Sequence, residues 1–225
     1  MDLNADLGEE ITDDAGLLAV ISSANVACGY HAGNAAIMRE VCAEAVRRGV
    51  SLGAQVSYAD RAGFGRTELD VPSALLTEQV ADQVGLLTEI ARAEGTDVRY
   101  LKPHGALYHR VARDPEQAAA VLAGSGSLPV LGLPGAVILD LAVQAGRDTW
   151  REGFPDRGYT SSGGLVPRGE PGALVADQTQ IAANAVRLAE TVDSVCVHGD
   201  SPGAVDAAMA VRAALERAGY PLRGL

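Results

Sequence analysis

The feature that most constrains the fold of this chain is the alternation of short β-like runs with amphipathic helical patterns along its whole length. Such alternation predicts parallel strands joined by helices that cover the sheet. The expected strands are Asp2 to Leu7, Ala24 to Cys28, Ser51 to Val56, Arg99 to Leu101, Pro129 to Leu133, a short stretch near Trp150, and Ser194 to Val197. The expected helices, four of them followed by a glycine suited to a left-handed helix end, are Ala35 to Arg48, Ser73 to Ala93, Pro115 to Ala123, Ala136 to Ala145, Gln178 to Glu190 and Gly203 to Ala218. The chain is therefore predicted to be an α/β protein.

Seven β/α units can close into a distorted barrel or lie open as a doubly wound sheet, and periodicity alone does not separate these two architectures. Polar clusters follow nearly every expected strand. A barrel with its site at the carboxyl ends of the strands requires that distribution, whereas a doubly wound sheet gathers such residues at one switch point. No long linker or low-complexity segment interrupts the pattern. We predict a single domain over residues 1–225, folded as a distorted seven-stranded (β/α) barrel.

Composition excludes several classes of function. The net charge of −11 and the pI near 4.7 argue against nucleic-acid binding, because the sequence has no basic stripe that could release counterions. Acidic residues follow Met1 and no long apolar run is present, so we expect no signal peptide, no membrane span and a cytoplasmic location. Three cysteines without CxxC spacing favour reduced thiols over disulfides or structural zinc.

The ends of the first two strands carry polar residues. Asn4 and Asp6 are two residues apart and face the same side of their strand. His31 lies in a glycine-rich turn after the second strand, and Asn34 is a candidate N-cap of the following helix. Polar groups inside an apolar barrel need partners, so these residues form either a satisfied structural network or part of a site. Cys28 has apolar neighbours, which favours a buried, inert thiol.

The fourth strand ends at Lys102, the only lysine of the sequence, close to His104. Every other basic side chain is an arginine, so a compact ammonium at this position suggests a specific purpose. Desolvation could lower the pKa of Lys102 toward a range useful for catalysis, or its charge could hold a carboxylate or phosphate. A surface lysine is the plain alternative.

His198 and Asp200 follow the last strand and are candidates for the same site. The alternative is that Asp200 or Ser201 only caps the next helix, and we exclude Ser201 from the site for that reason. Residues Gly153 to Val175 are rich in glycine and proline and are predicted to form a loop over the barrel mouth.

That loop offers two guanidinium groups, Arg157 and Arg168, that suit a carboxylate or phosphate. Solvated loop charges are the alternative. The sequence contains no GxxxxGK[ST] loop, no GxGxxG after the first strand, no GxSxG elbow and no HExxH helix. The standard phosphate, dinucleotide, serine-hydrolase and zincin signatures are therefore missing, and any use of ATP needs another explanation.

Five ordered blocks resemble the LamB/YcsF family, and they are Asp2 to Glu9, Ala24 to Gly33, Lys102 to Tyr108, Leu165 to Arg168 and Val197 to Asp200. The resemblance implies a seven-stranded (β/α) barrel related to the polysaccharide-deacetylase superfamily. It also implies 5-oxoprolinase activity shared with two other subunits, in which ATP cleavage drives the opening of 5-oxoproline to glutamate.

Two positions depart from the family pattern, which has aspartate where Asn34 stands and histidine where Gln55 stands. Amide side chains bind transition metals poorly beside imidazole and carboxylate. We therefore predict no tightly bound metal.

Opening a lactam requires a base for water, a proton donor for the leaving nitrogen and stabilisation of an oxyanion. We assign these roles to strand-end residues: Asp6 or Asp200 as base, His104 or His198 as proton donor, and Lys102 as charge stabiliser. The expected substrate-binding residues are Asn4, Asn25, His31, Arg157 and Arg168. ATP is expected to act mainly on, or together with, a partner subunit.

Two other functions stay open at this point. Three histidines near carboxylates could form a metal-dependent amidohydrolase or deacetylase site, and these are His31, His104 and His198. Alternatively, the departures at Asn34 and Gln55 could mark a binding or regulatory subunit whose site has decayed. The sequence leaves homo-oligomerisation open.

Overall fold

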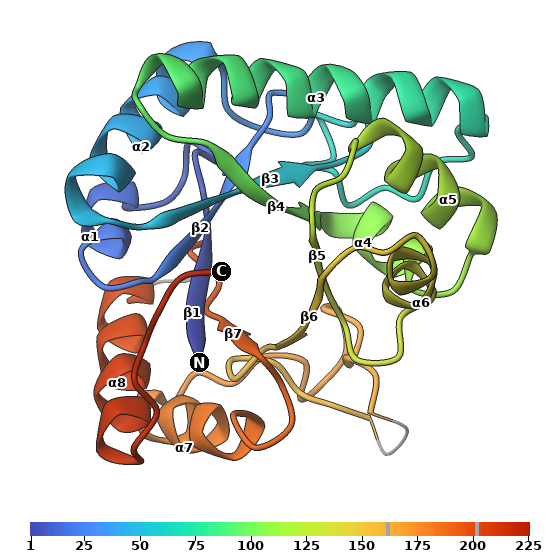
Figure 1. Cartoon of the computed structure of the whole chain (residues 1–225). Coiled ribbons are helices and arrows are strands. Elements are labelled where there is room, and N and C mark those ends of the chain that lie inside the picture. The colour runs from blue at the N-terminus through green and yellow to red at the C-terminus, as the bar shows by residue number, and fades with distance from the viewer. Residues whose placement is uncertain (161–162, 201–202) are drawn as a thin grey trace.

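The strands of the chain close into a parallel barrel with helices on its outside (Figure 1). The computed structural model describes residues 1–160, 163–200 and 203–225. Within them the strands run in sequence order around the barrel: β1 Asp2–Leu7, β2 Ser23–Ala27, β3 Ser51–Val56, β4 Val98–Pro103, β5 Val130–Gly132, β6 Thr149–Gly153 and β7 Ser194–Cys196. The predicted seven-stranded barrel is confirmed, and the doubly wound sheet is excluded.

Closure depends on β1, which pairs in parallel with β2 on one side and with β7 on the other. Asn4 lies opposite Ser23 in β2 and opposite Cys196 in β7. The barrel is uneven, because β5 and β7 have only three residues each and the β4–β5 ladder has one register pair, Leu101 with Val130. The expected distortion is therefore concentrated on the β4 to β7 side.

The helices confirm the six that were predicted, with small differences at their ends. They are α2 Ala35–Arg48, α3 Ser73–Ala93, α5 Pro115–Gly124, α6 Val137–Gln144, α7 Gln178–Leu188 and α8 Ala204–Arg217. Two short helices were not predicted, α1 Asp14–Leu18 and α4 Gly105–Val111. Both are too brief to show a helical period in the sequence.

Asn34 is the N-cap of α2, as expected. Its side chain accepts hydrogen bonds from the backbone N–H groups of Ala36 and Ile37 at 2.9 and 3.1 Å. Asp200 does not cap α8, which begins after Gly203, and Ser201 lies outside the described residues. Asn34 is exposed, so its side chain serves as a helix cap at the surface and not in the barrel interior.

The amino-terminal end of the barrel interior is polar. Asp2 is buried and accepts hydrogen bonds from the hydroxyls of Ser22, at 2.6 Å, and Ser194. Burial raises the pKa of Asp2 from 3.8 to about 6, although the serine hydrogen bonds oppose this rise. Above it, the Tyr100 hydroxyl donates to Asn25 at 2.7 Å. Gly53 makes room for this tyrosine, because a Cβ at position 53 would lie 2.2 Å from the ring.

All three cysteines are free and buried, in agreement with the expected reduced thiols. Among the described residues, no helix combines the length and apolar character needed to cross a bilayer.

Candidate active site

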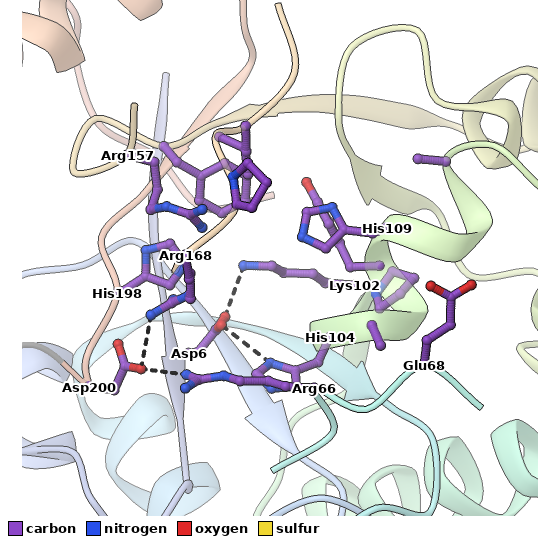
Figure 2. A pocket seen from close by; sticks show the side chains of 18 of the residues that line it. Asp6, Arg66, Glu68, Lys102, His104, His109, Arg157, Arg168, His198 and Asp200 are labelled. Carbon is purple, nitrogen blue, oxygen red and sulfur yellow. Dashed lines mark hydrogen bonds and ion pairs between the residues drawn. The ribbon is translucent and has the colours of Figure 1, made fainter. Parts of the chain in front are cut away.

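The carboxyl ends of the strands open into a pocket of about 660 Å³ (Figure 2). Its wall is built from the ends of β1 and β4, from α4, and from the segments that follow β1, β3, β6 and β7. The predicted loop over the mouth contributes Leu165 to Arg168, so this part of the expectation is confirmed. The polar and charged lining residues are Asp6, Glu9, Arg66, Glu68, Lys102, Tyr108, His109, His104, Arg113, Arg157, Arg168, His198 and Asp200.

Lys102 lies in the pocket floor and is buried. Its ammonium donates to Asp6 Oδ1 at 2.9 Å and to Cys196 Sγ at 3.2 Å, and it pairs with Glu152 Oε1 at 2.9 Å. Burial alone would lower the pKa of Lys102, but Asp6 and Glu152 hold it well above the usual value. The surface position and the lowered pKa considered from the sequence are therefore both wrong, and this lysine stays protonated.

Lys102 acts on Asp6 in the opposite sense. Burial would raise the pKa of the Asp6 carboxyl, and the neighbouring ammonium instead holds it well below its usual range. Asp6 is consequently a carboxylate at neutral pH and a weak base.

Glu152 is a site residue that the sequence did not reveal. It comes from β6, is fully buried, pairs with Lys102 and accepts a hydrogen bond from the Tyr108 hydroxyl at 2.8 Å. The expected strand was placed only near Trp150, so nothing in the sequence indicated that Glu152 points into the barrel. Glu152 does not line the cavity and pairs with Lys102 from below, while Asp6 and Glu9 are the buried carboxylates of the floor.

Asn4 and Asn25 were expected to orient a substrate, and the structure places them below the pocket instead. Both are fully buried and neither lines the cavity. The Asn25 amide donates to Asn4 at 2.7 Å and to Asp6 at 2.9 Å, while the Asn4 amide donates to Ser194 at 2.7 Å. Their hydrogen bonds are used to hold Asp6, because an unpaired amide inside an apolar barrel would be costly.

His31 and His104 lie beside each other at one side of the floor. Their rings are stacked with centroids 4.1 Å apart, and Glu9 Oε1 lies 3.7 Å from His31 Nε2 and 3.6 Å from His104 Nδ1. Donor atoms of these three residues lie within 4.8 Å of one another, so they could hold a metal ion. His31 is buried behind His104 and does not line the pocket, which corrects its expected contact with substrate.

His198 faces the pocket from the end of β7 and is held by Asp156. Its Nδ1 lies 2.8 Å from Asp156 Oδ2 and 3.1 Å from Oδ1, and its backbone N–H donates to the same carboxylate at 3.1 Å. Burial would raise the pKa of Asp156, but His198 holds it below the usual value. Nε2 of His198 forms no hydrogen bond with any described residue, so it is available to a ligand.

Asp200 lies between two arginines at the pocket mouth (Figure 2). Arg66 Nη2 is 2.6 Å and Arg168 Nη1 is 3.5 Å from Asp200 Oδ2. A carboxylate oxygen that already faces two guanidiniums is poorly placed to take a proton from water. The other oxygen, Oδ1, is buried without a partner among the described residues, so the role of Asp200 as base stays a prediction. Arg66 is a pocket residue that the sequence did not reveal.

Arg157 is buried in the pocket wall without a carboxylate partner. It donates through Nε to the carbonyl of Ala173 at 3.0 Å and through Nη2 to the carbonyl of Val166 at 2.6 Å. No ion pair links Arg157 to an acidic side chain within the described part of the chain. Burial and the nearby Arg168 charge lower the pKa of Arg157, which means that an anion bound beside it would be stabilised.

Known proteins resemble this chain over nearly its whole length. The LamB/YcsF family profile matches residues 1–225. A Streptomyces avermitilis protein, named as the A subunit of 5-oxoprolinase, is 53% identical over 242 residues, which cover 97% of this chain and 97% of that protein. A Mycobacterium avium protein of the same name is 48% identical, with 99% of this chain and 98% of the relative covered.

Solved structures agree with this grouping. The lactam utilization protein of Thermus thermophilus is 36% identical and superposes with a TM-score of 0.93 over 100% of this chain and 99% of that one. A peptidoglycan deacetylase from Bacillus subtilis, at 14% identity and a TM-score of 0.53 over 100% of this chain and 86% of that one, is similar in fold alone. The predicted relation to deacetylase barrels is thus confirmed at the level of fold. The chain belongs to the LamB/YcsF family.

Proposed function

We propose that this chain is the A subunit of an ATP-dependent 5-oxoprolinase and that its pocket hydrolyses the lactam of 5-oxoproline to glutamate. The names of the relatives and the lactam utilization protein support the substrate class. One observation carries the proposal: the same pocket contains Arg157 and His198. The Arg157 guanidinium has no carboxylate partner among the described residues, and the His198 imidazole is hydrogen-bonded to the Asp156 carboxylate.

The pocket has two electrostatic ends that match the two ends of the substrate. Arg157 and Arg168 line one wall and can hold the substrate carboxylate in charge-assisted hydrogen bonds. The buried carboxylates and Lys102 form the floor. A small lactam held by the arginines would direct its ring toward His198 and the floor, as the arrangement of labelled side chains in Figure 2 allows.

His198 is the residue best placed for proton transfer. Because the Asp156 carboxylate accepts from Nδ1–H, Nε2 carries the lone pair and can take a proton from water. The hydroxide equivalent adds to the lactam carbonyl and the C–N bond breaks. The proton then passes from Nε2 to the leaving nitrogen, which becomes the amine of glutamate. Lys102 retains its role as charge stabiliser only through space, since its N–H groups are directed to protein partners.

The sequence has no glycine-rich phosphate loop that would accompany this pocket. We therefore assign ATP to the two other subunits.

The experiment is reconstitution of the three subunits with ATP and 5-oxoproline, following glutamate and phosphate together. The proposal expects glutamate only when this chain and both partners are present. Glutamate formed by the partners without this chain, or by this chain without ATP, would overturn it.

A further inference from the structure

We infer that Gln55 takes the position of a metal ion between Glu9 and His104, and that it fixes His104 as the neutral tautomer with its proton on Nε2. Gln55 lies in β3 and is fully buried. Its Nε2 is 2.9 Å from Glu9 Oε1 and 2.9 Å from His104 Nδ1. One amide group therefore bridges two of the three atoms that could otherwise ligate a cation.

The hydrogen-bond roles follow from chemistry. A carboxylate oxygen only accepts, so Gln55 presents its NH₂ group, and not its carbonyl, to Glu9. The amide nitrogen has no lone pair to offer, so His104 Nδ1 must accept its other N–H. This leaves the proton of the imidazole on Nε2.

A second contact specifies the same tautomer independently. His104 Nε2 lies 3.2 Å from the carbonyl oxygen of Phe64, which can only accept. Phe64 is one of the few non-glycine residues with a positive φ, 56°, and this uncommon backbone conformation accompanies the contact. Both ring nitrogens of His104 are thus engaged, one as acceptor and one as donor.

The amide also excludes a cation. A transition metal bound to Glu9 and His104 would lie roughly 2.0–2.2 Å from each donor atom. Those atoms are 3.6 Å apart, and the Gln55 nitrogen is equidistant from them. An ion there would displace the NH₂ group, which cannot serve as a ligand because it has no free lone pair. The amide would have to rotate and present Oε1, which is buried without a hydrogen-bond partner among the described residues and binds transition metals poorly beside imidazole and carboxylate. The two N–H bonds supply the positive partial charge that the ion would supply.

The consequence for catalysis rests on the proposed function. A histidine whose two ring nitrogens are both hydrogen-bonded to protein groups is a poor proton donor to a lactam. Of the two expected proton donors, His104 and His198, we therefore assign proton transfer to His198. The two measurements below involve no turnover, so their failure is distinct from failure of the proposed function.

The first measurement uses cobalt(II) as probe, with visible absorption reporting coordination by protein ligands. The wild-type chain should show no intense visible band, whereas Gln55→His, which offers an imidazole in place of the amide, should show one. Gln180→His adds an imidazole at an exposed position and should behave as the wild type. An intense band in the wild type, or none in a folded Gln55→His chain, would overturn the inference.

The second measurement needs no substitution in the protein that is observed. Nitrogen-15 NMR of histidine-labelled wild-type chain, with the His104 signals assigned by their loss in His104→Gln, should show Nδ1 without and Nε2 with a bound proton. A proton on Nδ1, or rapid averaging between the two tautomers, would contradict the role given to Gln55.

Discussion

Lys102 sets the charge balance of the pocket floor, since it is the ammonium that faces two buried carboxylates, Asp6 and Glu152. Replacing one partner of a buried ion pair leaves the others without compensation, which costs about 3–5 kcal/mol. We predict that Lys102→Met lowers the free energy of unfolding by about this amount at pH 7, measured by urea denaturation. A change near zero would show that the lysine is not paired in solution.

Asp156 determines which nitrogen of His198 faces the pocket. In Asp156→Asn the side-chain amide no longer requires the proton of His198 to be on Nδ1. The tautomer with a free lone pair on Nε2, which acts as the base, is then less populated. We predict a fall in kcat of about 10²-fold or more with a KM close to that of the wild type. Asp140→Asn, an exposed substitution on α6 away from the pocket, is the matched control and should leave kcat unchanged. Equal rates in the two variants would refute the assignment.

Asp2 makes stability depend on pH in a direction opposite to that of an ion-paired acid. Its pKa is raised from 3.8 to about 6, so the folded chain holds the proton more tightly than the unfolded chain. The contribution of Asp2 to the free energy of unfolding is therefore fully present at low pH. It falls by about 3 kcal/mol as pH rises from about 4 to about 6. Asp2→Asn should therefore exceed the wild type in stability at pH 8 and differ little at pH 4. A Tm difference that does not change with pH would contradict this account.

At the scale of elements, the loop between β6 and α7 carries the substrate end of the pocket. Arg157 ties this loop together through the carbonyls of Val166 and Ala173. We predict that Arg157→Met raises KM for 5-oxoproline by about 10-fold or more, because a charged hydrogen bond is worth about 1.5–3 kcal/mol. It should also reduce hydrogen-exchange protection around Val166 to Ala173.

The control for this change is Arg187→Met, an exposed arginine on α7. If the two variants share the same KM and only Arg157→Met loses exchange protection, Arg157 is a structural tie with no contact to substrate. If KM and exchange are both the same, Arg157 serves neither purpose.

Helices and strands were predictable where they were long enough to repeat a pattern. The bounds of α2 and α3 follow from their apolar period and their flanking glycines. Strand-end residues such as His198 and Lys102 were found because barrel sites collect there. Their partners were not found, since Glu152 and Asp156 approach them only when β6 pairs with β7 and closes the barrel. Contacts across more than 40 positions of sequence leave no local signal.

At the scale of the whole molecule, the barrel separates two polar ends. The amino-terminal end holds the buried, hydrogen-bonded Asp2, and the carboxyl end opens into the pocket that contains His198, Lys102 and the two arginines. The net charge of −11 does not prevent anion binding there, because Arg157 and Arg168 lie at the pocket wall. The family resemblance inferred from five strand-end blocks is confirmed over residues 1–225.

The most direct measurement of the central claim is glutamate release by the reconstituted three-subunit enzyme carrying His198→Gln. Because ATP is assigned to the partners and proton transfer to His198, we predict that glutamate release falls by about 10²-fold or more while the variant keeps the wild-type Tm. Glutamate release within about twofold of the wild type would contradict the account, since a general base is typically worth about 10²-fold or more.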